Sequence, residues 1–121
     1  MKILIVDDNP LQVQAVSMFL VNDGHEVHYV MEGLEAIKEM QDRHYDLVLC
    51  DVMMPGISGL SLVSILRNIY LFRCPIIMIS SSENYLIRTQ SIDAGAEVFL
   101  KKPVSTADLR RHINRIINKS A

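Results

Sequence analysis

Five polar residues with the side chains needed for phosphoryl chemistry stand at or just after the ends of short apolar runs. They are Asp7, Asp8, Asp51, Ser80 and Lys102. Three carboxylates held close together repel one another unless a cation lies among them, and a hard divalent ion such as Mg²⁺ prefers oxygen ligands. An ammonium group and a hydroxyl can pair with an anion beside them. Together, the five predict transfer of a phosphoryl group onto a carboxylate.

These residues converge only if the apolar runs are strands of one sheet. Five runs, most of them continuous rather than alternating, occupy residues 3–6, 27–30, 47–50, 76–79 and 98–100. Continuous apolar runs are typical of parallel strands that are covered on both faces. Ligands of such sheets bind beyond the carboxyl ends of the strands, where all five polar residues lie. Singly, each residue fits a turn, a cap or a solvated charge, and only convergence favours a site.

Segments with helical spacing separate the apolar runs. Pro10 can open the first helix, a third helix opens near Gly59, and a weaker fourth extends from Asn84 to Asp93. The predicted apolar stripes of the first three helices are Leu11, Ala15, Phe19 and Leu20; Leu34, Ile37 and Met40; and Leu62, Ile65, Leu66 and Ile69.

The last predicted helix has the clearest start. Ser105 can cap it, Asp108 stands at the reciprocal position of a capping box, and an apolar stripe follows at Leu109, Ile113 and Ile116. Strand and helix thus alternate five times with short connections. This order predicts a single α/β domain over residues 1–121, with a (βα)₅ doubly wound parallel sheet.

The composition excludes several classes of protein. The chain has 121 residues, of which 50% are apolar and 21% charged, so it has enough apolar surface for a core and is not disordered. No run is long enough for a membrane span or a secretory signal, so we expect a cytoplasmic protein. Cys50 and Cys74 would lie too far apart on neighbouring strands for a disulfide, and we expect free thiols.

Charge is distributed unevenly along the chain. Residues 1–60 carry ten acids and three bases, whereas residues 61–121 carry four acids and nine bases. The acidic half suggests a cation site, and the basic half suggests an anionic partner or a salt-bridged face. Arg110, Arg111 and Arg115 fit either a docking face or favourable charges on the last helix. Because no aromatic residues interleave with these bases, we expect no direct nucleic-acid binding.

Four segments resemble the signature segments of bacterial two-component response regulator receiver domains of the chemotaxis-regulator type. They are Ile3-Leu4-Ile5-Val6-Asp7-Asp8-Asn9, Asp51-Val52-Met53-Met54-Pro55-Gly56-Ile57-Ser58-Gly59, Pro75-Ile76-Ile77-Met78-Ile79-Ser80 and Lys101-Lys102-Pro103. All four occur in order and together cover essentially the whole chain. The resemblance implies a flavodoxin-like fold with strand order 2-1-3-4-5.

The resemblance also implies a role for each polar residue. Asp51 would accept the phosphoryl group from a sensor histidine kinase, a histidine phosphotransfer protein or a small phosphodonor such as acetyl phosphate. Mg²⁺, for which Mn²⁺ can substitute, would bind Asp7, Asp8, Asp51 and the backbone carbonyl of Met53. Ser80 and Lys102 would contact the phosphoryl group, and the bond between Lys102 and Pro103 would be cis.

The implied function is a phosphorylation-dependent signalling switch. Such a protein is not an enzyme, beyond weak self-phosphorylation and self-dephosphorylation. After modification, Ser80 would move toward the phosphoryl group and Phe99 would rotate inward, because burial of an aromatic ring is favourable. The surface of the last two helices and last strand would then change and control a partner, a homodimer or an output domain, with no membrane contact.

Two other functions stay open at this point. An aspartyl-phosphate phosphatase could use a similar α/β core. In that class, however, the typical motif at the end of the first strand is Asp-x-Asp, whereas here Asp7 and Asp8 are adjacent. A degenerate receiver would only make protein contacts, although all five key positions are present. Because Met1 leads straight into the first apolar run, we expect an N-terminal or free-standing receiver.

Overall fold

The computed structural model describes residues 1–82 and 84–120, and strand and helix alternate throughout. The elements are β1 (Lys2–Val6), α1 (Pro10–Asn22), β2 (Glu26–Val30), α2 (Gly33–Asp42), β3 (Leu47–Asp51), α3 (Gly59–Asn68), β4 (Ile76–Ser80), α4 (Tyr85–Ala94), β5 (Val98–Lys101) and α5 (Thr106–Ser120). The strands form one parallel sheet in the order β2-β1-β3-β4-β5. The predicted fold and strand order are confirmed, and each strand is one residue longer than its apolar run.

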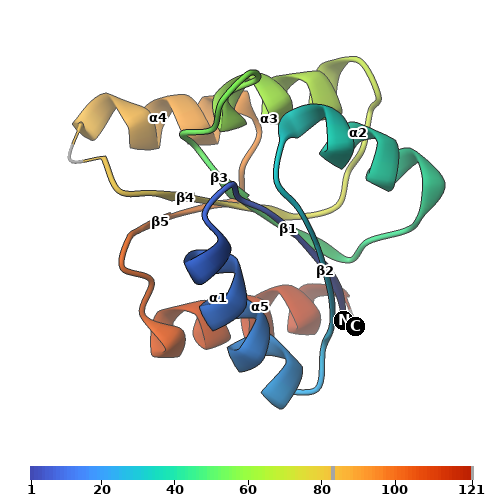
Figure 1. The fold of residues 1–121 in the computed structure, drawn as a ribbon, viewed down its shortest axis with the longest axis vertical. Helices are drawn as coiled ribbons and strands as arrows, with labels where there is room; N and C mark the ends of the chain where they lie inside the picture. Colours follow the sequence, from blue (N-terminus) through green and yellow to red (C-terminus); the bar gives the residue numbers. More distant parts are fainter. Residues whose placement is uncertain (83, 121) are drawn as a thin grey trace.

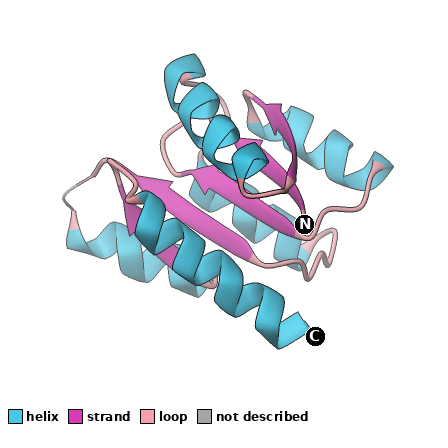
Figure 2. Cartoon of the chain, turned by 90° about the horizontal axis from the view of Figure 1, so that it is seen from below, coloured by secondary structure: helices cyan, strands magenta, loops and turns pink. Residues whose placement is uncertain are grey.

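The sheet lies between two layers of helices. Figure 1 shows α2, α3 and α4 on one face and α1 and α5 on the other, and Figure 2 shows the strands running side by side between them. Successive residues of the central strands point alternately into two separate apolar cores. Every residue of β3, from Leu47 to Asp51, is therefore buried. Burial on both faces is the physical reason for the continuous apolar runs.

The packing faces of three helices differ from the predicted stripes. In α1 the buried residues are Val13, Val16 and Leu20, whereas Leu11 is 77% exposed and Ala15 is also exposed. This helix carries apolar residues on several sides, so spacing alone does not identify the side that meets the sheet. Similarly, Leu34 of α2 and Ile69 after α3 are exposed, and Ala36 and Val63 are buried instead.

The last helix agrees with its prediction. Leu109, Ile113 and Ile116 are buried against the sheet, and the backbone N–H of Asp108 donates to Ser105 Oγ at 3.2 Å. Cys50 and Cys74 are free thiols, as expected. Among the described residues, no helix is both long and apolar enough to cross a membrane.

Gly59 allows α3 to begin directly against the end of β3. Its backbone N–H donates to the carbonyl of Val52 at 2.8 Å. A Cβ atom at this position would lie 2.1 Å from the carbonyl oxygen of Asp51 and 2.8 Å from Cα of Val52. Only glycine fits such a close approach of two backbones. The loop after Asp51 is therefore closed by the first residue of α3.

We predict that Gly59→Ala lowers the free energy of unfolding by about 1–3 kcal/mol, because the added methyl group must displace backbone. Gly33→Ala is the matched control, since Gly33 also begins a helix and the three atoms nearest to its Cβ would all belong to the side chain of Ile57, the closest at 3.1 Å. Urea denaturation of both variants measures the difference. Equal losses would show that the approach at Gly59 carries no special cost.

Candidate functional site

The five predicted site residues lie at one edge of the sheet. Asp7 directly follows β1, Asp51 ends β3, Ser80 ends β4, and Lys102 follows β5. The strand ends are level, because Val6 is paired with Cys50 in the register. Likewise, Asp51 is paired with Ile79, and Ser80 with Lys101. The parallel sheet thus gathers at its carboxyl edge groups that are up to 95 positions apart in the sequence.

Three carboxylates form the centre of the site. One side-chain oxygen of each of Asp7, Asp8 and Asp51 lies within 4.8 Å of the others. Asp7 is 5% exposed and Asp51 7%, whereas Asp8 is nearer the solvent. The backbone N–H of Asn9 donates to Asp7 Oδ1 at 2.9 Å and fixes the orientation of that carboxylate. Such crowding of like charges in a low-dielectric place is unfavourable without a counter-charge.

Lys102 supplies part of this counter-charge. Its Nζ atom lies 3.3 Å from Asp7 Oδ2 and 3.5 Å from Asp51 Oδ1, so one ammonium group bridges two buried carboxylates. The backbone N–H of Lys102 donates to the carbonyl of Ser80 at 2.8 Å, which fixes the start of this loop to β4. The peptide bond to Pro103 is cis, as the resemblance implied.

Burial is the main influence on the ionisation of Asp51. It raises the pKa of this carboxyl above its ordinary value, and the negative charge of Asp7 acts in the same direction. The ammonium of Lys102 and the backbone N–H of Met53 lower the pKa, but they do not outweigh burial. The ionised form of Asp51 is therefore less stable in the folded protein than in water, and a nearby cation would stabilise it.

The remaining predicted residues lie around this centre. Ser80 is fully buried, and its Oγ accepts a hydrogen bond from the backbone N–H of Ser82 at 3.0 Å. Phe99 is half-buried in β5 and packs against the core beneath α2, α3 and α4. The side chain of Met53 is exposed.

Sequence reasoning missed two supporting contacts. The first is the hydrogen bond from Asn9 to Asp7, and the second is the contact of Gly59 with Asp51. The side chain of Asn9 also caps α1 by accepting from the N–H of Leu11 at 3.0 Å. An asparagine between an acidic pair and a proline was the available signal for this cap. For Gly59, no pattern in the sequence indicates that the two backbones meet.

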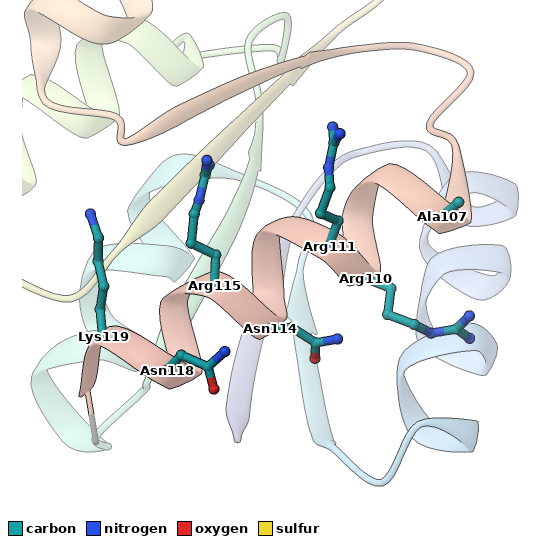
Figure 3. A pocket seen from close by; sticks show the side chains of 7 residues that line it. All are labelled: Ala107, Arg110, Arg111, Asn114, Arg115, Asn118 and Lys119. Atoms are coloured by element: carbon teal, nitrogen blue, oxygen red, sulfur yellow. The ribbon is translucent and has the colours of Figure 1, made fainter.

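The basic residues of α5 lie away from the carboxylates. Figure 3 shows Arg110 directed toward α1, whereas Arg111, Arg115 and Lys119 extend in another direction along a hollow of about 680 Å³. Arg110 pairs with Asp23 at 2.8 Å and lies over the ring of Phe19, so it fastens α5 to α1. That arginine has a structural role, and a docking role for the others stays a prediction.

Comparisons with known proteins agree on one family. The family model described as "Response regulator receiver domain" matches residues 3–114. The transcriptional regulatory protein CrdR of Helicobacter pylori is 30% identical over 117 residues, and the two-component response regulator PhoP of Pseudomonas aeruginosa is 30% identical over 121 residues. These alignments cover 97% and 100% of this chain but only 55% and 53% of the two regulators.

A third relative is much larger. Hybrid signal transduction histidine kinase G of Dictyostelium discoideum is 34% identical over an alignment of 119 positions, and the alignment covers 95% of this chain and 4% of that protein. Solved structures give the same result. The chemotaxis protein CheY4 of Vibrio cholerae superposes with a TM-score of 0.87 at 29% identity, covering 95% of this chain and 97% of that one. The receiver domain of Francisella response regulator 1452 gives 0.91 at 26%, covering 99% and 98%.

We predict that Asp51→Asn raises the melting temperature by a few degrees at neutral pH. Because the pKa of Asp51 is higher in the folded state, its ionised form destabilises the fold above that pKa, and this penalty disappears as the pH falls below the ordinary value for aspartate. The gain from Asp51→Asn should therefore vanish in acid. Thermal melts across that pH range measure it.

Asp46→Asn is the control of opposite sign. The backbone N–H of Lys2 lowers the pKa of Asp46, so this carboxylate stabilises the fold above its ordinary pKa and loses that effect as the pH falls. We expect Asp46→Asn to lower the melting temperature at neutral pH. If Asp51→Asn behaved in the same way, the burial of Asp51 would not be the dominant effect.

Proposed function

The chain belongs to the family of response regulator receiver domains, and we propose that Asp51 is the residue on which it is phosphorylated. Receiver domains are phosphorylation-dependent signalling domains that receive phosphoryl groups from histidine kinases. The observation that carries the assignment is the position of the Asp51 carboxylate. It is buried, lies 3.5 Å from the Lys102 ammonium and is clustered with the carboxylates of Asp7 and Asp8.

The strand order supports Asp51 over the other two carboxylates. β3 is the central strand, with β1 on one side and β4 on the other. Asp51 therefore has the carboxylates that follow β1 on one side and the hydroxyl of Ser80 on the other. In the transfer, a carboxylate oxygen of Asp51 forms a bond to phosphorus while the bond from phosphorus to the donor histidine nitrogen breaks. The electron pair returns to that nitrogen, which takes up a proton.

A divalent cation fits the acidic cluster. Receiver domains bind Mg²⁺ at an acidic site, and crowded oxygen ligands with two buried carboxylates are what a hard cation requires. Asp7, Asp8, Asp51 and the backbone carbonyl of Met53 would hold Mg²⁺, or Mn²⁺ in its place. When bound, the ion supplies positive charge that offsets the charge of the phosphoryl oxygens.

The other site residues would stabilise the phosphorylated state. Lys102 would exchange its ion pair with Asp51 for one with the phosphoryl group, and Ser80 would donate its hydroxyl to a phosphoryl oxygen. Movement of Ser80 would leave space beside β4 for Phe99 to rotate inward. Such a change would reach α4 easily, because Ser91 is the only buried residue among those of α4, all of which the structure describes.

The output surface would then be formed by α4, β5 and α5. Through it the protein would control a homodimer, a partner protein or an output domain, since the chain spans about half of CrdR and PhoP. Neither the site nor the comparisons favour the alternative of an aspartyl-phosphate phosphatase. The adjacent carboxylates of Asp7 and Asp8 serve better as cation ligands than as an Asp-x-Asp nucleophile and acid.

We predict that acetyl phosphate with Mg²⁺ labels the protein once, on Asp51. Asp51→Asn should abolish the label, Asp8→Asn should weaken metal binding at least tenfold, and Asp46→Asn, at the other end of the sheet, should leave both unchanged. Intact mass measurement and metal titration report the two quantities. An acid-stable label, or a label that persists in Asp51→Asn, would assign the acceptor to a serine instead.

We also predict that the phosphoryl mimic beryllofluoride shifts the amide resonances of α4 and β5 as well as those of the loop after Asp51. The reason is the path from Ser80 to Phe99 and the light packing of α4. Amide spectra with and without the mimic test this, with α2 as the internal reference that should not respond. A response confined to the loop after Asp51 would exclude this route.

A further inference from the structure

The loop that follows α3 exposes a run of apolar side chains. Ile69 is 69% exposed and Leu71 71%, and Tyr70, which is 38% exposed, has its ring stacked on Phe72 with 6.0 Å between centroids. We name residues Ile69 to Arg73 the 69–73 loop. It precedes β4 and so lies near the amino ends of the strands, away from Asp51 (Figure 1). Contiguous exposed apolar side chains of this kind commonly mark interaction sites.

Leu71 is exposed, and its backbone conformation is also unfavourable for a leucine. Its φ angle is +59°, and it is the one non-glycine residue at positive φ in the described part of the chain. The turn closes α3, with the N–H of Phe72 donating to the carbonyl of Leu66 at 2.9 Å. Glycine is the usual residue at such a helix end, and Gly95 has this role after α4. The fold itself therefore gives no reason for a leucine here.

The 69–73 loop is held in place by Arg67. One guanidinium nitrogen donates to the carbonyl of Phe72 at 2.7 Å, a second donates to Gly95 at 3.1 Å, and a third contacts both carboxylate oxygens of Glu97 at 3.1 Å. Glu97 in turn accepts from the N–H of Ile76 at 2.6 Å. The apolar side chains thus stand on a fixed backbone, which reduces the entropy lost on binding.

This surface carries one arginine whose charge no described carboxylate balances. Arg73 is exposed and has no ion pair with any residue that the structure describes. Arg73 lines two hollows. The first, of about 380 Å³, is also lined by Tyr45, Phe72 and Arg43. The second, of about 430 Å³, is also lined by Leu71 and Arg67. Arg43 and Arg67 are paired with glutamates.

The hollow of about 380 Å³ has one carboxylate among its lining residues, and the oxygens of that carboxylate already have partners. Asp46 lines the hollow of about 380 Å³ and accepts from the N–H of Lys2 at 2.7 Å and lies 3.3 Å from a ring nitrogen of His44. Glu97, which lines the other hollow, is paired with Arg67, so among the described lining residues the charged group without an ion pair is the guanidinium of Arg73. Its natural complement is a carboxylate.

We propose that the 69–73 loop is a docking surface for a protein segment that combines apolar and carboxylate side chains. Apolar side chains of the partner cover Ile69 and Leu71 and enter the hollow beside Phe72, and a carboxylate pairs with Arg73. Because this surface is at the far edge of the sheet from Asp51, docking does not require phosphorylation. The inference is thus independent of the function proposed for Asp51.

Leu71→Gly separates docking from folding. Glycine removes the apolar side chain but adopts positive φ without strain, so this variant should melt at the same or a higher temperature. Arg73→Gln removes the charge of an exposed side chain. The probe is a short peptide of leucine and glutamate, and the control peptide has lysine in place of each glutamate. Each peptide is titrated into the unphosphorylated protein, and the amide spectra report binding.

The glutamate peptide should shift the amides of the 69–73 loop, and the lysine peptide should not. Leu71→Gly and Arg73→Gln should each weaken binding at least fivefold, whereas Asp51→Asn should bind as the unaltered protein does. Equal binding of both peptides, shifts elsewhere only, or unchanged binding by Leu71→Gly would overturn the proposal. Concentration-dependent dimerisation that Leu71→Gly abolishes would also overturn it, because the occupant would then be a second copy.

Discussion

The buried carboxylates of Asp7 and Asp51 share the single ammonium group of Lys102. The reactive edge of this domain depends on this excess of negative charge. Two like charges about 4 Å apart repel by about 4 kcal/mol at an effective dielectric constant of about 20. That cost is comparable with the whole stability of a small domain. Asp7 and Asp51 are tolerated because Lys102 lies between them, but Asp8 adds a third negative charge, and the described residues supply no further base to this cluster. The negative charge of the three carboxylates therefore exceeds the positive charge of Lys102, and a divalent cation can balance it.

The sheet separates this edge from a second network at its amino end. There Arg67 joins the end of α3, the turn after α4 and the start of β5 through Phe72, Gly95 and Glu97. As a result α4 is fastened firmly at its carboxyl end. Its amino end, which follows the loop from Ser80, has no comparable anchor among the described contacts. The described contacts that anchor α4 therefore lie at the end away from the reactive edge.

The fold and most of the reactive edge could be predicted from sequence because both depend on local patterns. A strand buried on both faces must be apolar at every position, so the runs at residues 3–6, 47–50 and 76–79 identified the central strands. Once strands are parallel, the residues after them share an edge. The type and position of Asp7, Asp51 and Lys102 then predicted a carboxylate cluster beside an ammonium group, provided that the first and third strands are neighbours, an order that the resemblance to receiver domains implied.

Only the tertiary structure decided which surfaces meet and how deeply each group is buried. The sequence of α1 permits more than one packing face, and contact with the sheet selected Val13, Val16 and Leu20. The raised pKa of Asp51 follows from the burial of its carboxyl group, which no local pattern encodes. The same holds for Gly59 against Asp51 and for Leu71 at positive φ. These features depend on the backbone conformation of turns and on how closely elements pack, whereas hydrophobic periodicity records only whether a residue faces apolar surroundings.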